Sequence, residues 1–202
     1  LVGLSTTTII DLGAQAASYA RIQTVAPSVL ALAILSSAFT AQAIAVGFDR
    51  RYGVLTHLGT TPLGRSGLVL AKTLAISTIA FTQVILISVV AVLLGWRPTG
   101  SLLAAAGLMR LGMSAFSGLA LLMAGTLRAE ATLAGANLLF LLLLVGGGTI
   151  IPTDQWPSGV ARIVEFLPTA ALADGLRTIL RDGALPTLST WLVLLVWSAV
   201  GI

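Results

Sequence analysis

Few side chains in this sequence could carry out acid–base, nucleophilic or metal chemistry. The 202 residues contain one histidine, seven acidic residues and no cysteine. His57 cannot form a metal site by itself, and it lies in a polar loop away from Ser114 and Ser117, the hydroxyls that it would have to activate. Residues 67–73 lack the glycine that a phosphate-binding loop needs directly before Lys72. We therefore expect no catalytic, cofactor-binding or metal-binding residue, and we expect that the chain is not an enzyme.

Three strongly polar side chains, those of Gln83, Arg110 and Asn137, lie inside long apolar stretches. Holding an arginine near the centre of a bilayer costs about 2.5–3.5 kcal/mol on insertion scales. Arg110 therefore either extends toward the membrane surface or meets a partner across an interface or a water-filled cavity. Gln83 and Asn137 suit hydrogen bonds between helices, and contacts within a transport pathway are the alternative.

The composition indicates that these polar residues belong to a membrane protein. Apolar residues make up 57% of the chain and charged residues only 9%, whereas soluble domains carry about 25% charged residues. The mean hydropathy is +1.03. The net charge of +4 is small, and the sequence has no Lys/Arg cluster with interleaved aromatic residues, so we exclude nucleic-acid binding. We expect an integral membrane protein that is surrounded largely by lipid.

The long apolar stretches, each with at most one charge, predict the architecture. A helix that crosses a bilayer needs roughly 20 apolar residues, and these stretches do not alternate in polarity as the strands of a barrel do. The expected fold class is all-α, a polytopic helix bundle that forms a single transmembrane domain over 1–202, with an external segment at 1–20. We predict five spans, at 27–47, 73–95, 101–126, 132–151 and 186–202.

The segment between the first two predicted spans, 48–72, is long and basic. Cytoplasmic loops are enriched in Lys and Arg, so we expect this loop on the cytoplasmic side of the membrane. Asp49 is expected to cap a short helix that begins at Arg50. The apolar side of that helix would consist of Val54, Leu55 and Leu58.

The segment before the last predicted span, 152–185, has the pattern of two short amphipathic helices. Pro168 interrupts the apolar periodicity, and Thr169 is expected to cap the second helix. Asp174 and Arg177 have the spacing of an i, i+3 ion pair on its polar face. The predicted apolar faces are Trp156, Val160, Ile163 and Leu167, and then Leu172, Leu176, Ile179 and Leu180. We expect an external hairpin that lies at the membrane interface or re-enters the membrane, with an ordinary soluble loop as the alternative.

Two short motifs occur in order along the chain. The first is Asp49-Arg50-Arg51-Tyr52-Gly53, followed by Leu55, Leu58, Thr61-Pro62-Leu63, Arg65 and Lys72. The second, before the last predicted span, is Pro168, Asp174, Leu176 and Arg177. Together they resemble permeases of the ABC-2 exporter family, and the most similar branch is the one that contains daunorubicin-type antibiotic exporters. The resemblance runs from about Ala26 to Ile202.

The resemblance implies a transport subunit. The family has six spans preceded by an amphipathic helix, so the first span and that helix would be missing from this sequence. A separate cytoplasmic ABC ATPase subunit would bind ATP and Mg, and no cofactor would bind to this chain. Two permease subunits, as a homodimer or a heterodimer, would form the pathway between them. The exported compound would be amphiphilic or hydrophobic, such as an antibiotic, a drug or a lipid-like molecule, and the membrane would be the bacterial plasma membrane.

The resemblance also implies roles for individual residues. Coupling to the ATPase would fall to Asp49, Arg50, Arg51, Tyr52, Val54, Leu55 and Leu58. An external gate would contain Trp156, Pro168, Asp174 and Arg177. Gln83, Arg110 and Asn137 would lie in the pathway or at an interface, and membrane lipids would contact the outer surface. A membrane scaffold or accessory subunit that transports nothing is the alternative function.

Overall fold

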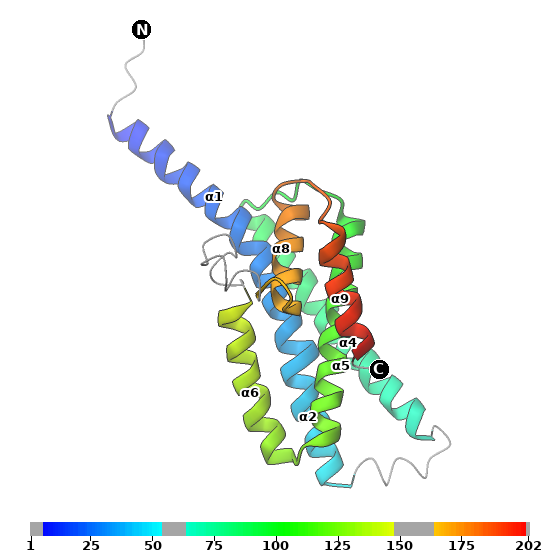
Figure 1. Cartoon of the computed structure of the whole chain (residues 1–202). Helices are drawn as coiled ribbons and strands as arrows, with labels where there is room; N and C mark the ends of the chain where they lie inside the picture. Colours follow the sequence, from blue (N-terminus) through cyan, green and yellow to red (C-terminus); the bar gives the residue numbers. More distant parts are fainter. Residues whose placement is uncertain (1–5, 54–63, 148–163, 201–202) are drawn as a thin grey trace.

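The computed structural model of the protein describes residues 6–53, 64–147 and 164–200. Throughout these three stretches the chain forms helices joined by turns, with no β-strand (Figure 1). The expected all-α class is therefore confirmed for this part of the chain. The predicted positions Val54, Leu55 and Leu58 lie outside the described stretches. So does the first predicted helix of the hairpin, with Trp156, Val160 and Ile163.

One long helix forms the axis of the protein. It consists of α1 (Thr6–Ile34), a π-helical stretch η1 (Leu35–Ala41) and α2 (Gln42–Arg51). The junction residues Ile34 and Ala41 keep helical backbone angles, so the three parts are continuous. The apolar part, Arg21–Arg51, has 31 residues. At 1.5 Å per residue it is about 46 Å long, which exceeds the ~30 Å hydrocarbon thickness of a bilayer. The first span is thus longer than the predicted 27–47 at both ends.

The segment 1–20, predicted to be external, belongs to this same helix from Thr6 onward, and its place outside the membrane stays a prediction. Residues 14–20 contain four alanines, the strongest helix former, and no proline occurs before Pro27. The charge at Arg21 suggests a boundary, yet nothing in the backbone preferences stops the helix there. Helix propensity therefore carries α1 beyond the apolar stretch.

Five further helices are described, and their ends follow local signals. They are α4 (Gly64–Leu93), α5 (Leu102–Thr126), α6 (Ala129–Gly146), α8 (Pro168–Leu180) and α9 (Leu188–Val200). The side chain of Ser101 accepts a hydrogen bond from the backbone N–H of Ala104 at 3.3 Å and so caps the start of α5. Because α2 reaches Arg51 and α4 begins at Gly64, the connection between them is shorter than the predicted loop 48–72.

Four of the described helices are long and apolar enough to cross a membrane. They are Arg21–Arg51, Leu74–Leu93, Leu102–Thr126 and Ala129–Gly146. The fifth predicted span, 186–202, contains α9, whose 13 described residues are about 20 Å long. The described helices therefore have the length and composition of a multi-pass membrane bundle, and the fifth span stays a prediction.

The buried core lies where the long helix, α5 and α8 meet. Helix α8 packs against α1, α5 and α9, and Figure 1 shows it between α1 and α9. Helix α5 also packs against η1, α2 and α9, while α6 lies on α2, and α4 lies on α1 and η1. The fully buried large side chains include Leu30, Ile34, Phe39, Leu108, Phe116, Leu172, Leu176 and Ile179. This core holds α8 inside the bundle.

The outward faces of the helices are apolar. Only 11% of the apolar window of α4 and 22% of that of α6 is buried inside the chain. Large side chains such as Leu93 and Leu103 are 80% and 84% exposed. Apolar surfaces of this extent contact lipid or another protein rather than water, which agrees with the membrane prediction.

Candidate functional site

The predicted coupling region begins in the last turn of α2. The prediction that Asp49 caps a helix starting at Arg50 is wrong, because both residues lie inside α2, which ends at Arg51 with Tyr52 as its C-cap residue. The helix of the first span continues through these positions and ends at Arg51. Gly53 then has a φ of 70°, a left-handed conformation that favours glycine and is common just after a helix. Arg50 and Arg51 therefore lie in the last turn of a membrane helix and not in a separate coupling helix.

The side chain of Arg50 joins α2 to the end of α5. Its Nη1 donates to the backbone carbonyl oxygen of Ala124 at 2.9 Å and also to that of Gly125. These carbonyls belong to the last turn of α5, where carbonyl groups lack partners within the helix and the helix dipole favours a cation. Arg50 thus caps the C-terminus of α5 and holds it against α2.

Arg51 and Tyr52 form a second, more exposed connection. Nη1 of Arg51 pairs with Oε1 of Glu130 in the first turn of α6, and the two side chains are 49% and 63% exposed. An exposed pair of this kind contributes less than about 1 kcal/mol. The ring of Tyr52 stacks on that of Phe48, with centroids 6.1 Å apart, and the guanidinium carbon of Arg51 lies 5.9 Å from the Tyr52 centroid. The end of α2 therefore presents a basic and aromatic surface.

A pocket of about 340 Å³ lies between the end of α2 and the turn that joins α5 to α6. Its lining residues are Gly47, Arg50, Arg51, Thr126, Leu127, Arg128, Ala129 and Glu130. Gly47 allows α2 and α6 to approach closely, because a Cβ at this position would lie 3.2 Å from Cγ2 of Thr132. With three arginines and one glutamate, the pocket is basic and suits an acidic partner surface.

Replacing Arg50 by methionine is expected to destabilise the protein by about 1–2 kcal/mol, because α5 loses its C-terminal hydrogen bonds and a favourable charge at its dipole. In a chain of this size that corresponds to a melting temperature about 2–8 °C lower. Arg51→Met is the matched control, since it removes only an exposed ion pair and a contact with the exposed Tyr52 ring. Its melting temperature should fall by less than about 4 °C and by less than that of Arg50→Met. Equal shifts for the two variants in a thermal melt would contradict the cap.

The second predicted region contains helix α8, at the position expected for the second helix of the hairpin. Leu167 has an extended backbone, with φ −76° and ψ 138°, as the residue before a proline prefers. Pro168 occupies the first turn, where its missing N–H is not needed. The prediction that Thr169 caps this helix is wrong, because the N-cap residue is Leu167 and no side chain caps the helix there. Pro168 therefore marks the start of α8.

The hairpin prediction expected α8 to present a polar face to water. The structure shows no such face. Every residue of α8 except Asp174 and Thr178 is buried. The helix is enclosed by α1, α5 and α9 because its surface is built of small and aliphatic side chains that pack closely against them. It is therefore a core helix and not one that lies flat at a membrane surface, whereas the re-entrant alternative stays a prediction.

Two glycines allow α8 and α5 to interlock. A Cβ on Gly112 of α5 would lie 2.9 Å from Cδ2 of Leu172, and a Cβ on Gly175 of α8 would lie 2.5 Å from Cδ2 of Leu108. Each leucine thus fills the space that the glycine of the opposite helix leaves open. Such reciprocal contacts bring membrane helices close together without any polar group.

Arg177 connects α8 to α1. Its side chain is 8% exposed, its Nε donates to Oγ of Ser28 on α1 at 3.1 Å, and its Nη1 donates to Oδ1 of Asp174. The side chain of Asp174 is 35% exposed. The i, i+3 spacing thus corresponds to an ion pair in the structure, but Arg177 lies in the core and not on a polar outer face.

The loop between α4 and α5 covers the other end of α8. The backbone N–H of Thr99 donates to the carbonyl oxygen of Leu180 at 3.1 Å, and the Thr99 hydroxyl donates to that of Arg181 at 2.9 Å. Gly100 lies directly against the carbonyl group of Ile179. These contacts satisfy the last carbonyls of α8. They lie at the end of the bundle opposite the coupling region (Figure 1).

The three polar residues predicted inside spans are all exposed, on α4, α5 and α6 respectively. Nδ2 of Asn137 donates to the carbonyl oxygen of Leu133 in its own helix at 3.0 Å. Gln83 and Arg110 make no hydrogen bond or ion pair with the described residues. Within the described residues neither Gln83 nor Asn137 bonds to another helix, so their role at an interface, like that of Arg110, stays a prediction.

Several residues that build these regions were not predicted from the sequence. Ser28 is one of them, because it lies 149 positions from its partner Arg177 and no local pattern links the two. Gly100 lies in the sequence Pro-Thr-Gly-Ser, whose composition indicates a turn. The composition does not reveal that this glycine contacts the backbone of Ile179. Glu130 could have been identified as an acidic residue in a first helical turn.

The comparisons with known proteins agree with this geometry. A family model described as ABC-2 type transporter matches residues 1–180, a range that includes the coupling region and α8. No curated protein matches the chain, and no solved structure does. Membrane domains of this family generally act with separate ATPase subunits and are not themselves catalytic. The chain therefore belongs to the ABC-2 type transporter family and is a multi-pass transmembrane permease domain.

Proposed function

We propose that the chain is the permease subunit of an ATP-driven exporter, related to the antibiotic exporters, that moves amphiphilic or hydrophobic compounds out of a bacterial cell. A separate cytoplasmic subunit binds ATP and Mg, and a second permease subunit completes the pathway. Closure of the ATPase subunits displaces the coupling region, and the pathway then changes from inward-facing to outward-facing.

The observation that supports this function most directly is that the end of α2 is bonded to both α5 and α6. Arg50 ties α2 to α5, and Arg51 ties α2 to α6. A force applied to the residues that follow Gly53 would therefore move three membrane helices together. The exposed basic surface at this end suits an acidic ATPase surface, and its arginines favour the cytoplasmic side.

The long first helix offers a physical link from this end to α8. Arg177 of α8 binds Ser28 of α1, and α1 continues through η1 into α2. A π-helical stretch is rare and is often found at functional sites. Movement of α2 would thus reach α8 through one continuous element, which agrees with an external gate that contains Pro168, Asp174 and Arg177.

The exposed polar residues support a second permease subunit. An arginine in lipid is unfavourable by about 2.5–3.5 kcal/mol near the bilayer centre, and Arg110 is exposed on α5. Contact with a second permease, or with a water-filled pathway between the two, removes this penalty. Gln83 and Asn137 would gain hydrogen-bonding partners in the same way.

The function is tested by reconstituting the chain with its ATPase and measuring ATP-dependent efflux of an amphiphilic dye from vesicles. Replacing both Leu55 and Leu58 by aspartate is expected to reduce efflux at least tenfold, because the predicted apolar contact with the ATPase is lost. Membrane insertion of the variant should be unchanged.

Leu102→Asp is the matched control, because Leu102 is an exposed leucine in the first turn of α5, where an acidic residue is well tolerated. Its efflux should remain close to that of the wild type. Normal ATP-dependent efflux in the Leu55/Leu58 variant would overturn the coupling assignment. Absence of any efflux with every ATPase tested would favour a scaffold.

A further inference from the structure

The basic pocket at the end of α2 lies where three membrane helices end or begin. Among its lining residues, Arg51 ends the apolar span Arg21–Arg51, Thr126 ends α5 and Ala129 begins α6. The ends of spans mark the level at which helices leave the apolar layer of a membrane, and lipid head groups begin at that level. The exposed ring of Tyr52, next to Arg51, is typical of this level. The pocket therefore lies at the depth of lipid phosphates.

The charge of the pocket stays positive when the nearby acidic residues are counted. Glu130 pairs with Arg51 and neutralises it, which leaves Arg50 and Arg128 among the lining residues. Asp49 precedes Arg50 in the chain and is not a lining residue. If its charge is counted as well, the arginines still outnumber the acids. The connection between α2 and α4 contains no further acidic residue. The pocket therefore attracts an anion.

Arg50 and Arg128 keep N–H donors that an anion can use. Arg50 uses Nη1 for the carbonyl oxygens of Ala124 and Gly125. Its Nη2 and Nε make no hydrogen bond with the described residues, and a guanidinium presents its donors as a planar fork. The side chain of Arg128 is exposed and makes no hydrogen bond or ion pair within the described stretches. Two oxygens of a phosphate match such a fork.

Apolar surface continues from the pocket along the outside of α5 and α6. Leu127 lines the pocket and is exposed, as are Leu122 on α5 and Leu133 on α6. Leu122 and Leu133 lie about one helical turn, roughly 5 Å, from the pocket residues of their helices, on the membrane side. The acyl chains of a lipid whose phosphate occupies the pocket would cover these leucines.

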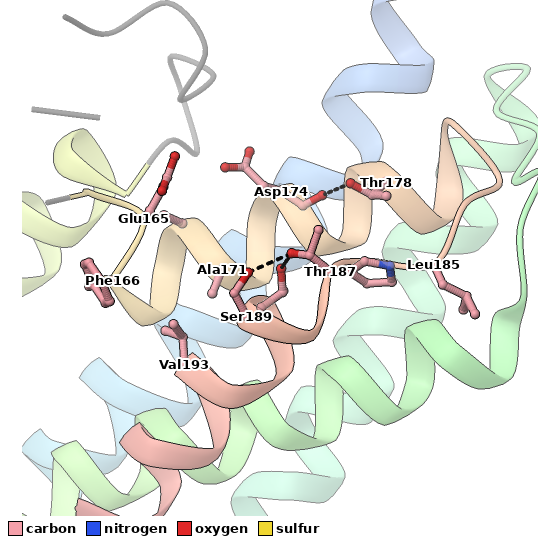
Figure 2. Close-up of a pocket in the computed structure, with 12 residues that line it drawn as sticks. Glu165, Phe166, Ala171, Asp174, Thr178, Leu185, Thr187, Ser189 and Val193 are labelled. Atoms are coloured by element: carbon pink, nitrogen blue, oxygen red, sulfur yellow. Dashed lines mark hydrogen bonds between the residues drawn. The ribbon is translucent and has the colours of Figure 1, made fainter. Parts of the chain in front are cut away.

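A cavity of similar size elsewhere in the bundle lacks this chemistry. It has a volume of about 380 Å³ and lies beside α8 and the start of α9 (Figure 2). Its lining residues include Glu165 and Asp174 but no Lys, Arg or His. It offers an anion no charged donor, and it serves as an internal comparison for the pocket at the end of α2.

We propose that the pocket at the end of α2 binds the phosphate group of an anionic membrane lipid, such as phosphatidylglycerol. The phosphate accepts hydrogen bonds from Arg50 and Arg128, and the acyl chains lie against Leu122, Leu127 and Leu133. A volume of about 340 Å³ suits one head group. Phosphatidylcholine has the same phosphate, but its choline places a positive charge next to the arginines. An acidic side chain of an ATPase would satisfy the same arginines, and the exposed leucines beside them favour the lipid.

Lipid binding does not depend on the proposed function, because it can be measured on the chain without ATP or an ATPase. Its consequence for export does rest on that function. A phosphate bonded to both Arg50 of α2 and Arg128 of the turn between α5 and α6 fastens these elements together. ATP-dependent efflux should then increase with the fraction of phosphatidylglycerol in the vesicles. Binding without any such increase would refute only the consequence, so the two failures are distinguishable.

The test uses the full chain in phosphatidylcholine nanodiscs with a small fraction of a photoreactive lipid, either phosphatidylglycerol or phosphatidylcholine, that carries a diazirine near the start of one acyl chain. We expect phosphatidylglycerol to label residues 122–133 at least about fivefold more strongly than phosphatidylcholine does, since one arginine near the surface contributes about 1 kcal/mol. The two lipids should label α9 equally.

Two results of this experiment would overturn the proposal. Equal labelling of residues 122–133 by the two lipids would leave the pocket to an acidic surface of the ATPase. Inorganic phosphate that competes as well as unlabelled phosphatidylglycerol would show a site for the free ion instead of a lipid. We expect inorganic phosphate to compete weakly, because it has no acyl chains.

Variants with single charges removed identify the pocket. Arg128→Gln is expected to weaken labelling by phosphatidylglycerol about fivefold. Glu130→Gln is expected to strengthen it, because it removes a negative charge and releases Arg51, whereas damage to the fold would weaken it. Arg97→Gln is the matched control, because Arg97 is exposed in the loop between α4 and α5 at the opposite end of the bundle (Figure 1), and its labelling should be unchanged. If neither Arg128→Gln nor Glu130→Gln alters the labelling, the pocket does not bind the lipid.

Discussion

Replacing Gly100 by alanine is expected to lower the melting temperature of the purified protein by about 6–12 °C, or to prevent its accumulation in the membrane. A Cβ at Gly100 would overlap the carbonyl oxygen of Ile179 and would lie 2.9 Å from its carbonyl carbon. A backbone group has no rotamer into which it could move away. The loop would have to separate from α8, and the two hydrogen bonds from Thr99 to the end of α8 would break.

Two other glycines serve as graded controls. Gly125→Ala should leave the melting temperature unchanged or slightly higher, because no atom lies within 4 Å of the added Cβ and alanine favours the helix. Gly175→Ala should have an intermediate effect, because the nearest atom, Cδ2 of Leu108, belongs to a side chain that can shift. If Gly100→Ala has the same melting temperature as Gly125→Ala, the loop between α4 and α5 does not hold α8 in place.

Much of the fold can be predicted from the sequence because the apolar interior of a membrane places the same requirement on every helix that crosses it. An apolar stretch of about 20 residues with at most one charge has few alternatives to a spanning helix, and this reasoning identifies the spans in α4, α5 and α6. It is less successful for the ends of helices. Charge at Arg21 and Asp49 suggests boundaries, but propensity carries α1 and α2 past both residues until Gly53 stops the second.

The candidate site is less predictable, because its geometry depends on contacts between distant segments. The spacing of Asp174 and Arg177 predicts their ion pair, since both residues lie on one helix. Their burial depends on Ser28 and on α5 and α9, which no local pattern reveals. The apolar faces predicted for an interfacial hairpin include Leu172 and Leu176, and the same hydrophobicity instead buries α8 among other helices. Hydrophobic periodicity indicates that a face is covered, but it does not indicate what covers it.

Arg177→Met is expected to destabilise the protein by about 2–3 kcal/mol, which lowers the melting temperature by about 4–12 °C. Methionine keeps much of the volume but leaves Asp174 without its positive partner and removes the hydrogen bond to Ser28. Breaking a fully buried ion pair costs about 3–5 kcal/mol, and the effect is smaller here because Asp174 is 35% exposed and can be hydrated. Arg181→Met is the matched control, since Arg181 pairs with Asp182 and both are about half exposed. It should shift the melting temperature by less than about 4 °C.

A double variant separates the ion pair from the connection to α1. Asp174→Asn combined with Arg177→Met removes both charges, so it should recover part of the stability that Arg177→Met loses, as expected when an uncompensated charge is the main penalty. It should not recover dye efflux, because the hydrogen bond from α8 to Ser28 on α1 stays absent. Recovery of both stability and efflux would mean that only the uncompensated charge of Asp174 caused the losses, and that neither the ion pair nor the hydrogen bond to Ser28 is required. In that case the route from the coupling region to α8 cannot run through Ser28, and the packing of Leu172 and Leu108 against Gly112 and Gly175 must carry the movement through α5.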